Sequence, residues 1–359
     1  MNIVQATHNY ETWLRHRTTL VQGDIKQKHQ LMAASPFPFL RATFYRWLQI
    51  WAKVCPEVSS APHVLAVGDL HIENFGTWRD DDGRLAWGIN DFDEVSHMPY
   101  TIDLLRLTTS ALIARELDHF ALKPRKIAAQ ILAGYTDAMA AGGRPFVLSA
   151  GHGWLRKIAL TSIREGAYFW AALSRLKLLD KHQVPVAARA AMERVMPEKG
   201  LSYGYARRSA GLGSRGHLRF VAVVDWRGGQ IAREAKALVP AASVWLRGEA
   251  GGGPILYSNI LRRAVRVPDP CFRVDGKWVV RRLSPSCRKI QIQSMPQKKD
   301  EKRMFYSMGW EVANVHLGTP RATPLVSEDL KGRKGDWLFE AGRAMVKAVR
   351  RDWKFWREQ

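Results

Sequence analysis

Apolar residues recur every three or four positions through most of the first 60 residues, and this spacing predicts helices. The predicted helices are HNYETWLRHRTTL, DIKQKHQLMAA and, after the break SPFPF, LRATFYRWLQIWAKV. The same spacing predicts a helix at TIDLLRLTTSALIARELDHF, which begins with a capping threonine and has an acid in its first turn. Further helices are expected over residues 123–141, 154–178 and 183–195.

Short apolar runs predict strands in two regions. HVLAVGD is one strand, and FGTWRDDDGRLAWGIND reads as two strands around an Asp-Gly turn. Beyond residue 205, LRFVAVVDWRGGQIAREAKALV and CFRVDGKWVVRRL predict two hairpins, the second turning at Asp275-Gly276. KDEKRMFYSMGWEVANVHLG predicts a long amphipathic helix. We therefore expect an α+β protein with a mainly helical part over 1–200, a strand-rich part over 205–290, and a helical segment over 291–359 that packs back on the first part.

Composition narrows the class of protein. With 359 residues and 46% hydrophobic content, the chain can bury a sizeable core. No run approaches the eighteen-odd apolar residues of a membrane span, and MNIVQATHNY lacks the features of a secretory signal, so a cytoplasmic protein is expected. Cys55, Cys271 and Cys287 are odd in number and far apart, which supports neither a disulfide framework nor a zinc site.

The net charge of +22 is unevenly distributed. Residues 1–200 carry 24 basic and 19 acidic side chains, whereas residues 201–359 carry 31 and 14. The basic second half favours an anionic partner, such as nucleic acid, a phosphorylated ligand or a membrane surface. A solvated arginine-rich surface explains the charge equally well, because net charge reports on solubility and association and not on mechanism.

The densest chemistry lies in VGDLHIENFG and the following NDFDE. Asp69 and Asn74 are five residues apart, the spacing of a loop in which an aspartate orients a hydroxyl and an asparagine holds Mg²⁺. Asp91 follows a predicted strand and suits a second ligand, because Mg²⁺ needs few protein oxygens beside water and phosphate. Taken singly, these side chains also suit a turn cap, a left-handed corner and a solvated acidic loop. Together, between apolar strands, they favour a cation site.

These segments resemble a known superfamily. GDLHIEN, INDFDE and IDLLRL resemble the HGDxxxxN, IDF and DLA signature of the protein-kinase-like superfamily, in its aminoglycoside phosphotransferase and choline kinase branch. Together with SPFPFLRAT and GLGSRGHLRF, they are similar to a bacterial family catalogued only as a domain of unknown function within that superfamily. The resemblance touches segments from about residue 26 to 316, and the 67–107 block is its specific part.

The resemblance implies roles for individual residues. Asp69 would be the catalytic base, Asn74 and Asp91 the Mg²⁺ ligands, and Asp103 a buried brace for the catalytic loop. His71 matches the histidine common in the small-molecule kinases, and it equally suits a structural histidine that bonds the loop backbone. Asp93 would add to the metal shell or face the substrate.

A nucleotide-clamping part is expected after the catalytic loop, since only 68 residues precede Asp69 and they read as helices. GLGSRG, with Gly211, Gly213, Ser214 and Gly216, runs into a strand as a kinase glycine loop does, whereas a Rossmann loop runs into a helix. Glycine lacks a side chain, so its backbone N–H groups can approach phosphates closely.

The next strand, IAREAKALV, should bring a cation to the phosphates. Arg233 and Lys236 are an odd number of residues apart and therefore lie on opposite faces of a strand. Lys236 is the favoured one, with Glu234 or a residue of the following helix as its partner. MGWEVANVHLG resembles the helix that precedes the catalytic loop in the superfamily. The resemblance thus implies a two-lobed protein-kinase-like fold, circularly permuted, with a helical catalytic lobe and a small antiparallel β-rich nucleotide lobe.

The expected function is that of an ATP- and Mg²⁺-dependent phosphotransferase acting on a hydroxyl of an unidentified acceptor. Adenylyl transfer uses the same ligands, and DFD in place of DFG leaves open a degenerate kinase that only binds nucleotide. The basic second half and GDWLFEAGRAMVKAVRRDWKFWRE also suit a nucleic-acid or membrane-surface module, but a docked C-terminal helix with snorkelling arginines is favoured. Five cations could face an anionic acceptor or simply be surface charges: Lys26, Lys28, Arg41, Arg281 and Arg282.

Overall fold

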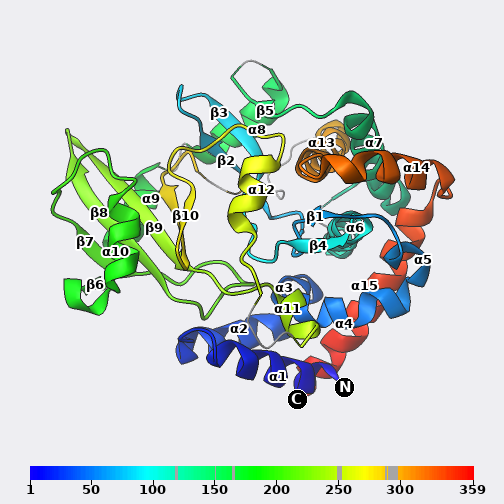
Figure 1. Cartoon of the computed structure of the whole chain (residues 1–359), viewed down its shortest axis with the longest axis horizontal. Helices are drawn as coiled ribbons and strands as arrows, with labels where there is room; N and C mark the ends of the chain where they lie inside the picture. The colour runs from blue at the N-terminus through cyan, green and yellow to red at the C-terminus, as the bar shows by residue number, and fades with distance from the viewer. Residues whose placement is uncertain (118–119, 150, 164–165, 249–252, 288, 290–297) are drawn as a thin grey trace.

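The computed structural model describes the chain except for residues 118–119, 150, 164–165, 249–252, 288 and 290–297, and it is a mixed α+β protein (Figure 1). Its α-helices are α1 (Ile3–Arg15), α2 (Gln22–Ala34), α3 (Pro36–Ala42), α4 (Phe44–Val54), α5 (Pro56–Ser59), α6 (Thr101–Glu116), α7 (Pro124–Ala141), α8 (Gly153–Ile163), α9 (Gly166–Ser174), α10 (Val186–Glu193), α11 (Ala242–Leu246), α12 (Tyr257–Arg263), α13 (Lys298–His316), α14 (Thr323–Gly332) and α15 (Trp337–Arg357). Its strands are β1 (His63–Ala66), β2 (Phe75–Arg79), β3 (Leu85–Ile89), β4 (Ser96–Pro99), β5 (Phe146–Val147), β6 (Leu178–Leu179), β7 (Gly204–Arg207), β8 (Arg219–Trp226), β9 (Gly229–Ala237), β10 (Arg273–Asp275) and β11 (Trp278–Leu283).

The largest sheet has six antiparallel strands in the order β10-β11-β9-β8-β7-β6 and lies at the left of Figure 1. Apolar side chains of α10 pack on one face, against Phe220, Ala235 and Val280. On the other face, Phe169, Trp170 and Leu173 of α9 pack against a few small strand residues. We refer to this unit as the sheet part.

The remaining helices surround α6, which is buried on all sides from Thr101 to Ala114. Its sequence predicted an amphipathic helix, but α7, α13 and α15 pack around it together with α3 and α5 and leave no solvent-facing side along that stretch. Two small sheets, β1-β4 and β2-β3-β5, lie between this helical part and the sheet part (Figure 1). The segment that runs from β1 through α6 therefore lies in the middle of the molecule.

Glycines allow α7 and α13 to pack closely. A Cβ at Gly134 would lie 1.9 Å from the carbonyl oxygen of Tyr306, and a Cβ at Gly309 would lie 1.9 Å from that of Ile131. Any larger side chain at either position would push the two helix backbones apart. This close contact fixes α13 beside the segment that carries the candidate site.

The two ends of the chain lie beside each other. The C-terminal helix α15 packs against α1 and α4, so the last helix completes the core that the first helices begin (Figure 1). Arg46 of α4 bonds to both ends, donating to the carbonyl oxygen of Met1 at 3.1 Å and to Asp352 Oδ2 at 2.7 Å. The C-terminal Trp- and Arg-rich stretch is thus a docked amphipathic helix, as the sequence favoured.

Most predicted elements are present, with three differences. The predicted break SPFPF forms the start of α3 instead, and only Thr43 separates α3 from α4. In the segment predicted as a helix over 154–178, α8 and α9 are helical, and residues 164–165 lie outside the described part of the chain. Asp275 pairs with Trp278, so the turn of that hairpin is Gly276-Lys277, one residue later than predicted. Packing also groups α9 and α10 with the sheet, whereas the sequence grouped all of residues 1–200 together, because helix periodicity does not say which partner a helix buries its face against. Among the described residues, no helix is long and apolar enough to cross a membrane.

Candidate active site

The loop that follows β1 is held by a buried aspartate. Asp103, in the first turn of α6, accepts hydrogen bonds from the backbone N–H groups of Val67 at 2.7 Å and Gly68 at 2.8 Å. His316 of α13 contacts the same carboxylate at 2.9 Å, and none of the Asp103 side chain is exposed. Gly68 has φ +85°, and a Cβ there would lie 2.5 Å from the carbonyl oxygen of Glu94. The loop conformation is therefore fixed by α6, α13 and the second acidic segment.

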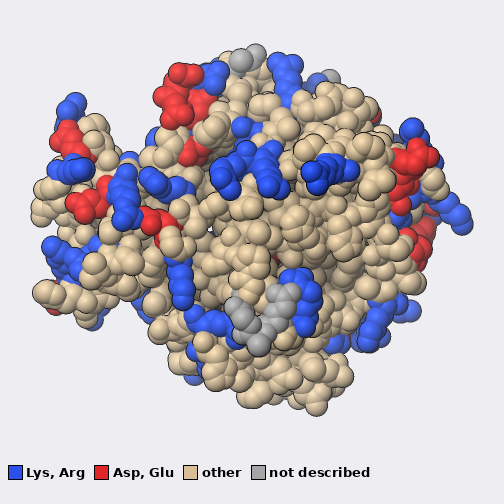
Figure 2. Space-filling view, in the orientation of Figure 1, with Lys and Arg blue, Asp and Glu red and all other residues tan. Residues whose placement is uncertain are grey.

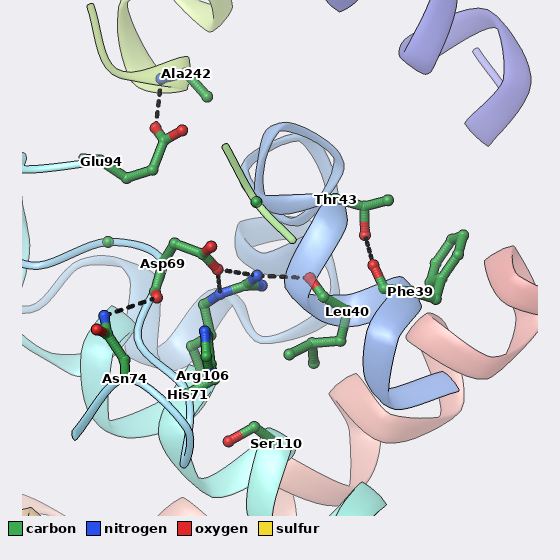
Figure 3. Close-up of polar contacts among 12 residues, drawn as sticks. Phe39, Leu40, Thr43, Asp69, His71, Asn74, Glu94, Arg106, Ser110 and Ala242 are labelled. Atoms are coloured by element: carbon green, nitrogen blue, oxygen red, sulfur yellow. Dashed lines mark hydrogen bonds and ion pairs between the residues drawn. The ribbon is translucent and has the colours of Figure 1, made fainter. Parts of the chain in front are cut away.

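Asp69 projects from this loop and is paired with Arg106 of α6 (Figure 3). Arg106 Nε lies 2.9 Å from Asp69 Oδ1, and Nη2 donates both to that oxygen and to the carbonyl of Leu40. The guanidinium is fully buried and lies over the rings of Phe44 and Trp47. Because Arg106 binds Oδ1 only, the second carboxylate oxygen of Asp69 is left to face the cleft.

The glycine-rich segment 211–216 lies directly over Asp69. A Cβ at Gly213 would be 3.1 Å from Asp69 Oδ2, so only glycine gives this approach without a shift of the neighbours. Lys28 Nζ of α2 donates to the carbonyl of Gly213 at 3.1 Å. Gly216, with φ +102°, packs where a Cβ would lie 2.4 Å from Ile25. Helix α2 therefore positions the glycine-rich segment against the catalytic-loop candidate.

Asn74, Asp91 and Asp93 form the acidic side of the same cleft. Asn74 Nδ2 donates to the carbonyl oxygen of Asp91 at 3.0 Å, and Asn74 Oδ1 is buried without a hydrogen-bond partner among the described residues. Lys236 Nζ of β9 donates to Asp91 Oδ1 at 3.0 Å and to Asp93 Oδ2 at 2.6 Å. A buried amide oxygen with no donor is the kind of group that a hard cation satisfies.

These residues fit Mg²⁺ only as a partial ligand set. Within the described residues, no three histidine, cysteine or acidic side chains are close enough to form a metal site by themselves. One amide and one or two carboxylates still suit Mg²⁺, which takes its other oxygens from water and phosphate. Asn74, Asp91 and Asp93 would hold the ion, and its retention would depend on a phosphate ligand.

Neighbouring charges separate the pKa values of the two carboxylates. Burial raises the pKa of Asp91, but the nearby Lys236 and Lys289 more than offset it and leave the net pKa below its ordinary value. Burial and the adjacent Asp91 raise the pKa of Asp93 to about 6. Asp91 therefore stays anionic at lower pH than Asp93, which takes up a proton as the pH falls through about 6.

Residues 20–152, which carry Asp69, Asn74, Asp91 and Arg106, match the model of a protein family. It is described as an uncharacterized protein conserved in bacteria (DUF2252). The match agrees with the predicted resemblance to a bacterial family of unknown function and does not extend to the kinase-like superfamily. No curated protein and no solved structure matches the chain.

The structure brings most of the sequence-predicted site residues together. The cleft is lined by Asp69, His71, Asn74, Asp91, Asp93, Gly211, Gly213 and Ser214. Lys236 contacts its acidic wall, whereas Gly216 packs on Ile25 beside it. Arg233 lies on the opposite face of β9, where Nε donates to the carbonyl oxygen of Val195 at 2.8 Å. The predicted placement of Arg233 and Lys236 on opposite faces of the strand is thus present, and Lys236, favoured by the family resemblance, is the one at the cleft.

His71 is held as a neutral ring. Burial, followed by the nearby Arg41, lowers its pKa well below the ordinary value. Its Nδ1 accepts a hydrogen bond from the backbone N–H of Glu73 at 3.1 Å. This contact is the loop-bonding role that the sequence left open beside a catalytic one.

The partner predicted for Lys236 was wrong. Glu234 lies two residues away on the same face of β9 but binds Arg208, Arg219 and Arg281, and Lys236 instead binds Asp91 and Asp93. The cause is tertiary, because Asp91 and Asp93, in the segment between β3 and β4, come to Lys236 from about 145 residues earlier in the chain.

Sequence reasoning missed Arg106 and gave Glu94 no specific role. A charged residue within the continuous apolar run of the α6 sequence was the available signal for Arg106. Glu94 Oε2 accepts a hydrogen bond from the backbone N–H of Ala242 at 2.6 Å, at the start of α11 (Figure 3). Nothing in the local sequence of Glu94 indicates this contact, since its partner is 148 residues away.

The structure predicts a pH effect on stability at Glu94. Burial raises the pKa of its carboxyl group to about 8, so the folded protein holds this proton more tightly than the unfolded chain does. The stability that the folded protein gains from holding this proton is fully present below the ordinary pKa of glutamate, and it is lost as the pH rises through about 8. Glu94→Gln keeps an acceptor for Ala242 and carries no charge. We expect its stability relative to wild type to increase by about 1–2 kcal/mol between pH 5.5 and 8.5.

Urea unfolding across this pH range measures the effect. Glu57→Gln, at an exposed glutamate of α5, is the matched control and should follow wild type at every pH. Parallel stability curves for wild type and Glu94→Gln would show that Glu94 does not hold a proton in the folded state.

Proposed function

We propose that the protein is an ATP- and Mg²⁺-dependent phosphotransferase of kinase-like type that acts on a hydroxyl group. The main support is the close approach of the glycine-rich segment to Asp69, in the cleft that Asn74 and Asp91 also line. Backbone N–H groups of a glycine-rich turn, a metal-binding pair and a carboxylate are the parts that phosphoryl transfer needs. Segments more than a hundred residues apart supply them.

In this proposal Asp69 orients the acceptor hydroxyl and accepts its proton. Arg106 binds Oδ1 and prevents the carboxylate from rotating, which leaves Oδ2 for the hydroxyl. Positioning of this kind contributes much of the rate in phosphoryl transfer, because the reaction demands little covalent chemistry of the protein.

Bound Mg²⁺ would neutralise charge on the phosphate oxygens. Asn74 Oδ1 and the carboxylates of Asp91 and Asp93 would hold it, and Lys236 is near enough to these carboxylates to contact a phosphate beside the ion. Binding of the ion and the phosphates beside Asp91 and Asp93 would redistribute the hydrogen bonds of Lys236.

Nucleotide binding requires the glycine-rich segment to move. The space enclosed between this segment and Asp69 is only about 50 Å³, which holds a few water molecules. A triphosphate is larger, so the segment must lift from Asp69 and lose the contact between Gly213 and Lys28. Closure over the substrate would then exclude water from the transferred phosphate.

The fold part of the proposal is a two-lobed kinase-like arrangement with a circularly permuted chain. The residues after α13 lie beside β1, where the N–H of Leu65 donates to Thr319 Oγ1 at 2.9 Å. In an unpermuted kinase-like chain, the helix that corresponds to α13 would come directly before the catalytic loop, and its end would therefore be expected beside β1.

On the face drawn in Figure 2, lysine and arginine side chains are spread over several elements and interrupted by acidic and neutral ones. Nucleic-acid binding proteins gather their cations into a stripe or patch that follows the phosphate backbone. Among the described residues on the face drawn in Figure 2 the cations form no such stripe, which favours the enclosed site over a nucleic-acid surface on that face.

The proposal is tested by Mg²⁺-dependent nucleotide binding. We expect ATP with Mg²⁺ to raise the melting temperature of the wild-type protein, and Asp91→Asn to weaken this binding about tenfold or more by removing a charged ligand. ATP without Mg²⁺ should bind the variant and wild type alike, because Lys236 keeps Asp93 as a partner.

Asp82→Asn, at an exposed aspartate in the β2-β3 turn, is the matched control. A stabilisation by ATP and Mg²⁺ that Asp91→Asn leaves intact would refute the metal assignment. Retention of the protein on DNA at moderate salt without stabilisation by nucleotide would favour the nucleic-acid alternative.

A further inference from the structure

A second cavity of about 440 Å³ opens beside the cleft, and Asp91, Gly211 and Lys289 line both. Its walls come from the ends of β2 and β3, from β11 and from α9 of the sheet part. The volume is in the range of small-molecule sites, whereas the cleft at Asp69 holds only water or an ion. A ligand in this cavity would be in reach of Asp91, a candidate metal-binding carboxylate.

The lining of this cavity is strongly basic. Its only acidic lining residues in the described part of the chain are Asp91 and Asp269. Six cations line it: Arg208, Arg219, Arg266, Arg281, Arg282 and Lys289.

Glu234 forms ion pairs with three of these arginines. Its carboxylate is fully buried and accepts from Arg219 at 2.7 Å, from Arg281 at 2.8 Å and from Arg208 at 2.6 Å. Burial raises the pKa of Glu234, but the three guanidinium groups outweigh it and keep the net pKa well below its ordinary value. One anion fixes three cations in a converging arrangement and leaves most of their charge uncompensated.

Two further cations have no anionic partner at all among the described residues. Arg282 Nη2 contacts only the sulfur of Cys271, and its buried Nε has no hydrogen-bond partner. Lys289 Nζ has no carboxylate within ion-pair distance, and burial together with the nearby Arg41 lowers its pKa to about 8. A buried guanidinium N–H without an acceptor costs free energy unless a ligand or solvent satisfies it.

We infer that this cavity binds a phosphorylated ligand, with a phosphate group between Arg281 and Lys289. Arg282, the next residue of β11, points to the other face of the strand and lines the same cavity from there. Several converging cations suit a multiply charged tetrahedral anion better than a single carboxylate, and guanidinium groups bind phosphate oxygens in pairs. Trp78, Phe169 and Phe272 supply apolar wall for the rest of the ligand. That the ligand is a substrate rests on the proposed function. It would be either the nucleotide, bound through its own phosphates, or a phosphorylated acceptor.

The binding step can be tested without catalysis. We expect inorganic tripolyphosphate to bind the wild-type protein in Mg²⁺-free buffer, measured by isothermal titration calorimetry, with an affinity that falls as salt is raised. Arg282→Gln and Lys289→Gln should each weaken this binding at least tenfold. Neither variant leaves a buried carboxylate unpaired, so both should stay folded.

Matched controls are Arg351→Gln and Lys347→Gln on the exposed side of α15, which should bind tripolyphosphate as wild type does. Absence of binding by wild type, or equal losses in the cavity and control variants, would overturn the inference. Binding of ATP with Mg²⁺ but not of tripolyphosphate would refute this site and leave the proposed function standing. Tripolyphosphate binding by a wild-type protein that is not stabilised by ATP with Mg²⁺ and does not turn over ATP would support the site and contradict the proposed function.

Competition distinguishes the two sources of the phosphate. Displacement of tripolyphosphate by ATP and equally by ADP supports a site for the phosphates of the nucleotide. Displacement by glycerol 3-phosphate in the presence of saturating ATP and Mg²⁺ supports a site for a phosphorylated acceptor.

Discussion

Asp69→Asn should lower ATP turnover about a thousandfold while ATP and Mg²⁺ still bind the variant within about threefold of wild type. Asparagine keeps the size of the side chain and one acceptor oxygen for Arg106, but it cannot take a proton from the acceptor hydroxyl. The selective loss of turnover follows from the position of Asp69 Oδ2, which faces the glycine-rich segment and is free of Arg106. Turnover is measured as ADP release, and binding as the shift in melting temperature.

The variant also loses the charge opposite a buried guanidinium. Arg106 is 1% exposed in its side chain, so removing its anion should destabilise the fold by up to about 3 kcal/mol. Rates must therefore be compared at temperatures where the urea curves show both proteins folded. Asp82→Asn, which is 76% exposed in its side chain, controls for the chemical change and should keep full activity. Turnover by Asp69→Asn at the wild-type level would remove Asp69 from the mechanism.

Asp103→Ala should lower the free energy of unfolding by about 3–5 kcal/mol. Its carboxylate accepts from Val67 N, Gly68 N and His316 Nε2, all within 2.9 Å, and no solvent reaches it. Truncation leaves two buried backbone donors and a buried histidine without their acceptor, and it opens a cavity beside the loop. Urea denaturation followed by tryptophan fluorescence measures the loss.

Two comparisons make this result specific to the loop. Asp103→Asn retains one acceptor oxygen and should lose less stability than Asp103→Ala. Asp225→Ala, at an exposed aspartate of β8, should change stability by no more than about 0.5 kcal/mol. A small loss in Asp103→Ala would mean that water or a neighbouring group replaces the carboxylate, and the loop would not depend on α6.

Local patterns predicted the hairpins well, because a strand and its turn are adjacent in the chain. The strands on either side of DDDG and the hairpin from 219 to 237 lie within a few residues of their predicted places. The assignment of α9 and α10 to the sheet was not predictable in this way. Each buries an apolar face, and the sequence does not specify which of several apolar surfaces receives it.

Long-range ion pairs were the least predictable feature. Strand alternation placed Arg233 and Lys236 on opposite faces, but the partner of Lys236 lies about 145 residues earlier in the chain. Arg106 likewise pairs with a residue in another element, and its burial depends on the rings of Phe44 and Trp47. Pairings of this kind depend on which faces pack together, and a single sequence does not record them.

The sequence by itself determined most of the longer helices and strands, their approximate order, and the clustering of acidic and amide side chains after β1 and β3. These features depend on backbone geometry within a few residues, which side-chain spacing and turn residues report directly. Only the tertiary structure decided that Gly213 lies against Asp69, that Lys236 binds Asp91 and Asp93, and that six cations line one cavity. The physical reason is that contacts between distant segments arise from burial and close packing of whole faces, to which residues far apart in the chain contribute jointly.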